Sequence, residues 1–340
     1  MSSNRRDSLP RSQIAEQRDT CRVCGCNSAA PYLSVPRDAG DGRWRLRSCR
    51  GCSFVWLGEA LAPDELAAHY PPEYYGRENG RFRGVGEAFE TWCRRLRARS
   101  IARLRAPGSI LDVGCGRGVM LAALRDRGWR VRGTELSACA ARRARDVPRL
   151  DVHVGDISTL SPGDETFDVV TLWHVLEHLP DARDCLEHVR ERIKPDGLLV
   201  VAVPNIDSLE ARLGGPHWFH LDLPRHVSHL SVRTLDRLLR AVGFTPVKMK
   251  RFSLEYGPYG MLQTLLNRMD FAHNLLYNAL KAPGARMHWP IGRWHGALQL
   301  GATLLLLPLL APLAALLHLL DGLAFGGSCI EIHAVPTREQ

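Results

Sequence analysis

A glycine-rich turn at residues 109–118 carries the strongest chemical signal in the chain, with the sequence Ser-Ile-Leu-Asp-Val-Gly-Cys-Gly-Arg-Gly. Residues 110–113 predict a short buried strand, and residues 119–127 predict a helix. Glycines at G-x-G-x-G spacing between them predict a tight turn that can cradle a nucleotide. The carboxylate of Asp112, two residues before the first glycine, suits a cationic or amino-bearing ligand better than a diphosphate.

Two more acidic residues end the next predicted strands. Residues 129–135 predict a strand that ends in Glu135, 21 residues after Gly114, from where a carboxylate can accept both hydroxyls of a ribose. A third strand end at 153–157 contains Asp156, a fourth strand and its loop follow at 167–180, and a turn leads into a fifth strand at 193–205. Because parallel strands end at one edge of a sheet, these acids are expected to face one ligand.

The order of these motifs resembles the class I S-adenosylmethionine (SAM)-dependent methyltransferases. The resemblance implies SAM as cofactor and a Rossmann-like α/β sheet with helices on both faces, in which Asp156 meets the adenine amino group. The alternative, an NAD-dependent Rossmann enzyme, is disfavoured by the glycine spacing and by the Pro-Asn ending of the fifth strand. The expected cofactor-binding residues are Asp112, Gly114, Cys115, Gly116, Gly118, Glu135, Asp156, Ile157 and Trp173.

Histidines dominate the two loops that follow the fourth and fifth predicted strands. The first loop contains His174, and the second, at 215–229, contains four histidines among proline and glycine residues. Loops with ionisable residues at this edge are typical of substrate sites. We expect His220 or His226 to be a general base with a pKa near neutrality, and Arg225 to hold an anionic group such as phosphate. A purely structural or capping role remains open for each histidine. The catalytic candidates are His174, His220, His226 and Arg225.

Four cysteines form two C-x-x-C pairs separated by a segment that predicts a hairpin at 32–46. Two such turns give the four thiolates of a structural zinc site, with no open position for catalysis. The expected ligands are Cys21, Cys24, Cys49 and Cys52, while Cys26 is expected to be a spectator. This ribbon, followed by a tyrosine-rich linker and the glycine turn, resembles a bacterial methyltransferase group that includes zinc-containing sugar C-methyltransferases.

An uncharged apolar segment at 300–317 is long enough to cross a membrane. Pro308 and Pro312 are expected to interrupt it. Residues 231–242 predict an amphipathic helix, and residues 245–256 predict the sixth strand of the sheet. Residues 328–336 predict the last strand, so the chain must return to the face from which it departed. We therefore expect contact with a membrane through 286–325 as a hairpin or an interfacial helix pair, flanked by Arg286, His288, Trp289, Arg293 and Trp294. A buried subdomain or a dimer interface remains the alternative.

The chain is predicted to divide into successive parts around one methyltransferase core. We expect a disordered leader (1–19), a zinc ribbon (20–56), a linker with N-terminal helices (57–106), the SAM-binding core (107–256), an apolar helical insert (257–327) and the last strand with a tail (328–340). The polar N-terminus predicts no secretory signal, and scattered cysteines suit a reducing cytosol. A cytoplasmic protein, peripheral at the inner face of the membrane, is expected.

The expected activity is methylation of a hydroxyl or carbon of a glycan, nucleotide-sugar or lipid-linked small-molecule acceptor. The net charge of +9 also allows a ribosomal RNA methyltransferase. That alternative is disfavoured because the loop after the fourth strand lacks the Asn/Asp-Pro-Pro-Tyr type used on base amines. A non-catalytic protein that binds partners through its zinc ribbon is the third alternative, against which the intact acids at 112, 135 and 156 argue.

Overall fold

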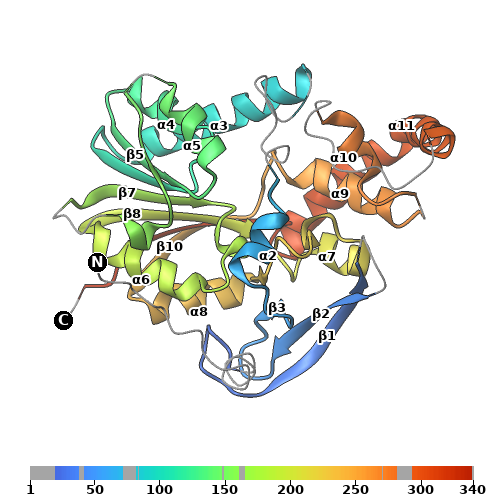
Figure 1. Ribbon diagram of the computed structural model, residues 1–340, viewed down its shortest axis with the longest axis horizontal. Coiled ribbons are helices and arrows are strands. Elements are labelled where there is room, and N and C mark those ends of the chain that lie inside the picture. The colour runs from blue at the N-terminus through green and yellow to red at the C-terminus, as the bar shows by residue number, and fades with distance from the viewer. Residues whose placement is uncertain are drawn as a thin grey trace, which may run out of the picture.

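A computed structural model describes residues 20–37, 42–71, 82, 84–147, 149–160, 165–269, 271–281 and 293–338 (Figure 1). The expected leader at 1–19 and the flanking residues Arg286, His288 and Trp289 lie outside these ranges.

A seven-stranded sheet organises the molecule, in the order β10-β11-β8-β7-β4-β5-β6. The strands from β8 to β6 pair in parallel, whereas β11 is antiparallel to both of its neighbours, β8 and β10. This arrangement confirms the predicted doubly wound sheet and its last antiparallel strand. The strands are β4 (Ser109–Val113), β5 (Arg130–Glu135), β6 (Asp151–Val154), β7 (Phe167–Trp173), β8 (Ile193–Pro204), β10 (Phe244–Lys250) and β11 (Cys329–Pro336).

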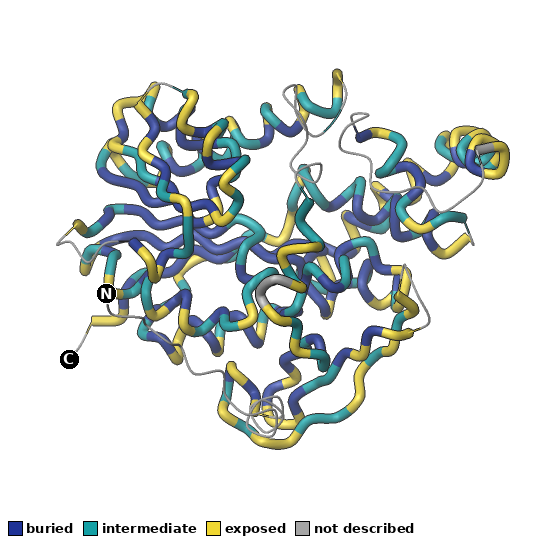
Figure 2. Tube along the Cα trace, viewed as in Figure 1, coloured by how far each residue is buried: buried dark blue, intermediate teal, exposed yellow. Residues whose placement is uncertain are grey.

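Helices cover both faces of this sheet because its central strands are apolar on both sides (Figure 2). One core cluster joins the sheet to α3 (Val85–Leu104), α4 (Val119–Arg125) and α5 (Ala138–Arg145). The other joins it to α6 (Ala182–Arg192) and α8 (Val232–Ala241). The predicted amphipathic helix at 231–242 is confirmed as α8, whose first turn is capped by the Ser231 hydroxyl.

The sixth strand is shorter than the sequence suggested. Residues 245–256 were expected to be extended, but β10 ends at Lys250 and a new helix, α9 (Gly257–Asn267), begins soon after. Beyond Lys250 the chain has no partner strand, because β11 begins its pairing with β10 opposite that residue. The residues between β10 and α9 therefore turn toward the carboxyl edge of the sheet.

One carboxylate holds three strands together at the opposite edge of the sheet. Asp168 Oδ2 accepts hydrogen bonds from the main-chain N–H and the hydroxyl of Ser109, at 2.7 and 2.9 Å, and Lys194 Nζ lies 2.7 Å from Oδ1. Burial alone raises the pKa of Asp168, but the Lys194 and Ser109 contacts outweigh it and lower that pKa to about 2. The ionised carboxylate therefore ties the first residues of β4, β7 and β8.

Replacing Asp168 by asparagine is expected to lower the free energy of unfolding by about 1–2 kcal/mol, a value discounted for the one-third exposure of the pair. Because the folded-state pKa is depressed, the contribution is fully present above pH 3.8 and is lost as the pH falls toward 2. Urea unfolding at pH 7 measures the loss. Asp126→Asn, at an exposed carboxylate paired with Arg125, is the control and should change stability by less than about 0.5 kcal/mol.

A second, four-stranded antiparallel sheet contains the cysteine-rich N-terminal segment, in the order β1-β2-β3-β9. The predicted hairpin is confirmed as β1 (Ala29–Pro36) and β2 (Arg43–Cys49). The fourth strand, β9 (Ser228–His229), comes from the histidine-rich loop of the large domain and pairs with β3 (Val55–Leu57). A short helix, α2 (Pro63–Ala68), follows β3.

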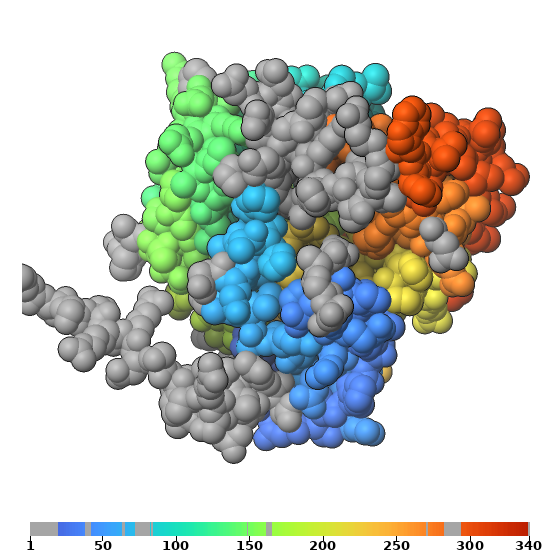
Figure 3. Space-filling view, turned by 45° about the vertical axis from the view of Figure 1, so that its right-hand side comes forward, coloured from blue at the N-terminus to red at the C-terminus, as the bar shows by residue number. Residues whose placement is uncertain are grey.

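The apolar insert forms a lobe of helices at one side of the molecule (Figures 1 and 3). It contains α9, α10 (Leu275–Leu280) and α11 (Arg293–Ala324), and the chain then enters β11. The expectation that Pro308 and Pro312 interrupt the apolar segment is wrong, since α11 continues through both. Each proline removes one donor from the helix, but the surrounding leucines are strong helix formers, and the cost at two sites does not break a helix of 32 residues.

Candidate functional site

The glycine turn after β4 has the backbone conformation that only glycine adopts readily. Gly114, Gly116 and Gly118 have φ angles of 71°, 56° and 70°. A Cβ atom on Gly114 would lie 2.6 Å from Val175 Cγ2, and one on Gly118 would lie 2.7 Å from Leu150 Cδ1. At Gly116 the nearest atom would be Arg94 Nη1 at 3.8 Å, so the main chain there borders open space.

Two carboxylates lie beside this turn at the ends of β4 and β5. Asp112 is buried, and its Oδ1 accepts a hydrogen bond of 2.6 Å from the Thr171 hydroxyl; burial raises its pKa to about 7. Each oxygen of Glu135 accepts one main-chain N–H, from Gly116 at 2.9 Å and Ser137 at 2.8 Å, and burial raises its pKa. A carboxylate oxygen has two lone pairs, so Glu135 keeps acceptor capacity for hydroxyl groups of a ligand.

The remaining predicted cofactor residues follow the neighbouring strand ends. Asp156 lies after β6, where its Oδ1 accepts the N–H of Ser158 at 2.9 Å, and Ile157 is fully buried. Trp173 ends β7, and its buried indole Nε1 has no hydrogen-bond partner among the described residues. Cys115 is buried under the turn. The structure therefore brings all nine predicted residues to the carboxyl edge of β4, β5, β6 and β7.

Helix α3 supplies a cation to this edge that the sequence did not reveal. The Arg97 guanidinium lies 4.5 Å from the centroid of the Trp173 ring and is hydrogen-bonded to Glu255. Its Nη2 also lies 3.4 Å from the hydroxyl of Tyr256. No motif signals this contact, because α3 and the residues after β10 are far apart in the sequence.

Two of the predicted catalytic histidines meet around Tyr256. The ring of His174 lies 4.0 Å from that of Tyr256, and the ring of His220 lies 6.1 Å from it. His174 has a φ angle of 55°, a strained backbone for a residue with a side chain, and its Nδ1 lies 3.0 Å from Glu177 Oε1. Such strain is frequently found where a side chain is held for function.

The other two predicted catalytic residues lie in a neighbouring group. Arg225 makes a two-pronged ion pair with Asp222, so its guanidinium is already engaged by a carboxylate. His226 Nδ1 lies 2.7 Å from the carbonyl oxygen of His220, and its Nε2 lies 3.8 Å from Asp222 Oδ2. The structure thus separates His226 and Arg225 from the pair around Tyr256.

Burial sets the ionisation of these histidines. It lowers the pKa of His174 and of His220 to about 3, with positive Arg97 adding to the effect at His174. Burial also lowers the pKa of His226 to about 4. The expectation of a near-neutral pKa for His220 and His226 is therefore wrong, since a charged imidazole loses its hydration in this interior. All three rings are neutral proton acceptors at neutral pH.

The four predicted metal-ligating cysteines come together in the N-terminal sheet. Their sulfur atoms all lie within 4.8 Å of one another, with Cys21–Cys52 and Cys24–Cys49 sulfur distances of 3.5 Å. Tetrahedral zinc with bonds of about 2.3 Å sets sulfur atoms roughly 3.8 Å apart, so the group has the right size for one ion. Gly51 donates its N–H to Cys49 Sγ at 3.3 Å, and Cys26 is not part of the group.

Hydrogen bonds join this cysteine-rich sheet to the histidine loop. Leu57 donates its N–H to the carbonyl of Val227 at 2.9 Å, next to the pairing of β3 with β9. The Tyr70 hydroxyl, on the chain that follows α2, lies 2.8 Å from His178 Nδ1. The N-terminal sheet therefore positions the loop that contains His226.

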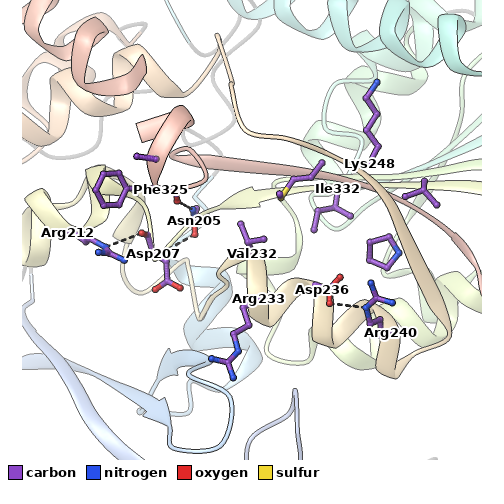
Figure 4. A pocket seen from close by; sticks show the side chains of 14 residues that line it. Asn205, Asp207, Arg212, Val232, Arg233, Asp236, Arg240, Lys248, Phe325 and Ile332 are labelled. Atoms are coloured by element: carbon purple, nitrogen blue, oxygen red, sulfur yellow. Dashed lines mark hydrogen bonds and ion pairs between the residues drawn. The ribbon is translucent and has the colours of Figure 1, made fainter. Parts of the chain in front are cut away.

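A separate basic groove of about 640 Å³ lies beside α8, β10 and the end of α11, and none of the predicted site residues lines it (Figure 4). Arg240 is paired with Asp236 on its wall, and Arg212 donates to the main-chain oxygen of Asp207. Phe325, next to the end of α11, also lines the groove. Its cationic residues are Arg212, Arg233, Arg240 and Lys248.

A doubly wound sheet with a glycine turn after β4 and acids at the ends of β4, β5 and β6 defines a nucleoside-binding protein of the Rossmann-like class. The sequence profile of a family described as a methyltransferase domain matches residues 85–249. Residues 85–249 therefore form a methyltransferase domain, and this part of the chain resembles S-adenosylmethionine-dependent methyltransferases. The matched residues contain the glycine turn, the three acids and the histidine loop, so the family assignment coincides with the site.

Curated relatives match only part of their own length. A probable S-adenosylmethionine-dependent methyltransferase of Mycolicibacterium smegmatis is 28% identical over 42% of this chain and 54% of its own. The mitochondrial ubiquinone biosynthesis O-methyltransferase of Schizosaccharomyces pombe is 32% identical over 39% of this chain and 50% of its own. Among solved structures, the Burkholderia thailandensis 1,6-didemethyltoxoflavin-N1-methyltransferase aligns over 90% of this chain and 100% of its own, with 19% identity and a TM-score of 0.47. The chain thus spans about half the length of these two curated relatives.

Proposed function

We propose that this protein transfers a methyl group from SAM to a hydroxyl or carbon of a small-molecule acceptor, in the class of glycans, nucleotide sugars and lipid-linked intermediates. The observation that carries the proposal is the convergence of the glycine turn, its carboxylates and a histidine pair at one edge of the sheet. Two of the relatives are named ubiquinone biosynthesis O-methyltransferases, and a name that gives oxygen as the methylated atom favours a hydroxyl acceptor here.

The residues at this edge fit a cationic nucleoside. Glu135 would accept the ribose hydroxyls, Asp156 and Ile157 would contact the adenine, and Asp112 would face the amino group of the methionine part. The unpaired Trp173 Nε1 offers a donor beside them. When bound, SAM supplies a methyl group made electrophilic by its sulfonium, which suits transfer to a nucleophilic oxygen or carbon.

The acceptor must lose a proton, and we assign the role of proton acceptor to His174. Its ring is neutral at neutral pH, and Glu177 Oε1 fixes its orientation through Nδ1. A carboxylate that holds an imidazole in this way also stabilises the imidazolium that forms when Nε2 accepts the proton. His220 and Tyr256 complete the wall on which the acceptor would rest.

Incubation with methyl-labelled SAM and fractionated host extract tests this activity. Label is expected in a small-molecule or lipid fraction and should depend on the acids at the edge of the sheet. Label in the RNA fraction, or no binding of SAM at all, would refute the proposal.

The four cysteine sulfurs support a structural zinc ion in the N-terminal sheet. Removal of the ion with a strong chelator is expected to raise amide hydrogen exchange at His229 at least tenfold, because β9 then loses its ordered partner β3. Mass spectrometry of peptides from 226–230 measures the change. Peptides from 109–113, in the centre of the large sheet, should keep their protection, and equal deprotection there would contradict the local effect.

Contact with a membrane through α11 is the last part of the proposal. Within the described residues, α11 is the one helix long and apolar enough to cross a membrane, and only 11% of its apolar window is buried. Both flanking strands belong to one sheet, so we place α11 at the membrane surface instead of across the bilayer. The basic groove at its C-terminal end would face anionic headgroups.

Leu305→Glu combined with Leu309→Glu is expected to lower binding to anionic vesicles at least tenfold, because the two side chains are 84% and 68% exposed on α11. Vesicle flotation measures the bound fraction. The control is Val85→Glu, which places one glutamate at an 86% exposed apolar residue outside the insert. A wild-type protein that stays wholly with the soluble fraction would contradict this part.

A further inference from the structure

Three side chains that can bind a metal ion form a cluster beside His174. Glu177 and His178 follow β7, and His226 lies in the loop after β8. Each offers one ligand atom, and these atoms all lie within 4.8 Å of one another. The cluster joins two loops of the large domain. The chain after α2 also contacts it, through the Tyr70 hydroxyl and His178.

Hydrogen bonds hold both imidazole rings. His226 Nδ1 lies 2.7 Å from the carbonyl oxygen of His220, whereas His178 Nδ1 lies 2.8 Å from the Tyr70 hydroxyl and 3.2 Å from the carbonyl oxygen of Arg225. An N–H donated to a carbonyl keeps the proton on Nδ1 and leaves the lone pair on Nε2. Imidazoles that bind metal ions are typically held in this way by their second nitrogen.

Glu177 supplies a buried oxygen that lacks a partner. Its side chain is 3% exposed, and Oε1 is occupied by His174 Nδ1. Oε2 is buried and has no hydrogen-bond partner among the described residues. An unpaired carboxylate oxygen is costly inside a protein, and a cation would satisfy it. Arg225, whose main-chain carbonyl contacts His178, has its guanidinium paired with Asp222 instead.

We propose that Glu177, His178 and His226 bind one divalent transition-metal ion, separate from the ion of the cysteine ribbon. Two imidazoles and one carboxylate suit zinc, manganese or ferrous iron and leave coordination positions open. An acceptor hydroxyl bound at an open position would have a lowered pKa and would pass its proton to His174 more readily. This catalytic role rests on the proposed methyl transfer, whereas binding of the ion does not.

Metal counting and titration with Mn²⁺ test the site in the full-length protein. Elemental analysis of zinc-loaded protein is expected to give two ions per chain, one for each site. Mn²⁺ serves as a second probe in protein whose ribbon has been reloaded with one equivalent of zinc, because thiolates select zinc over manganese. Electron paramagnetic resonance of free Mn²⁺ should show one bound equivalent, and Glu177→Gln or His226→Asn should weaken this binding at least about 100-fold.

His188→Ala is the matched control. His188 also has two acidic neighbours, with Asp184 and Glu191 oxygens 3.8 and 3.4 Å from its nitrogens, but these carboxylates are on the surface. This variant should bind Mn²⁺ like the wild type. An equal loss in His188→Ala, or a wild type with one metal ion and no Mn²⁺ binding, would overturn the site.

SAM titration of the same samples separates this proposal from the proposed function. Protein that binds SAM but no second ion refutes the metal site alone, and protein that binds the ion but no SAM refutes the methyl transfer alone. Thermal unfolding of the metal-free variants shows whether they are folded. His178→Asn provides an additional variant at the less buried ligand and should also lose the bound Mn²⁺.

Discussion

Replacing Glu135 by alanine is expected to weaken SAM binding by at least about 100-fold. In the proposed complex this carboxylate accepts both ribose hydroxyls, and hydrogen bonds to a charged group contribute about 1.5–3 kcal/mol each. Loss of both corresponds to about 3–6 kcal/mol, or roughly two to four powers of ten in affinity. Isothermal titration calorimetry with SAM measures the change.

Two controls separate this loss from damage to the glycine turn, since Glu135 also accepts the N–H groups of Gly116 and Ser137. Glu135→Gln keeps one carbonyl acceptor and should recover part of the affinity. Asp151→Asn changes an exposed acid on the next strand, 66% exposed and paired with Arg132, and should bind SAM like the wild type. Wild-type affinity in a folded Glu135→Ala variant would show that the ribose lies elsewhere.

Replacing His174 by alanine is expected to lower turnover by about 100- to 10,000-fold, the usual contribution of a positioned general base. SAM affinity should change by less than about threefold, because the proposed role of His174 is toward the acceptor. The measurement is the rate of label transfer from methyl-labelled SAM into the fraction that the wild type methylates, at saturating SAM.

His188→Ala on α6 is the matched control, since it removes an imidazole from the surface and should leave turnover unchanged. His220→Ala tests the competing base on the other side of Tyr256. Full turnover in His174→Ala together with a large loss in His220→Ala would transfer the role to His220. A drop in SAM affinity that matched the drop in turnover would instead show that His174 is needed for binding of the cofactor.

The sheet and its glycine turn could be predicted because their signals are local. A buried apolar strand, three glycines and a helix lie within residues 109–125, and the acids follow at intervals fixed by strand and helix lengths. The C-x-x-C pairs are equally local, so the sequence predicted the group of four sulfurs. Residues 328–336 could be assigned to the last strand because the methyltransferase fold that the motifs indicate ends in such a strand.

Other parts of the site depend on contacts that no local pattern contains. Arg97 meets Trp173 and Tyr256 only because α3 packs beside β7 and the chain after β10. The low pKa values of His220 and His226 result from burial by distant segments, whereas the sequence alone suggested values near neutrality. Continuity of α11 through Pro308 likewise reflects the summed stability of a long helix, which the proline alone does not reveal.

The position of β11 means that the large sheet can be completed only at the end of synthesis. This strand fills the place between β8 and β10, yet Cys329 leaves the ribosome only after the whole of α11. Until then β8 and β10 have exposed edges with unpaired main-chain groups, while the leucines of α11 are already exposed to solvent. In this state the exposed leucines of the nascent chain would favour binding to a lipid surface before the sheet is complete. The final strand would then be inserted at the membrane where the mature protein is proposed to act.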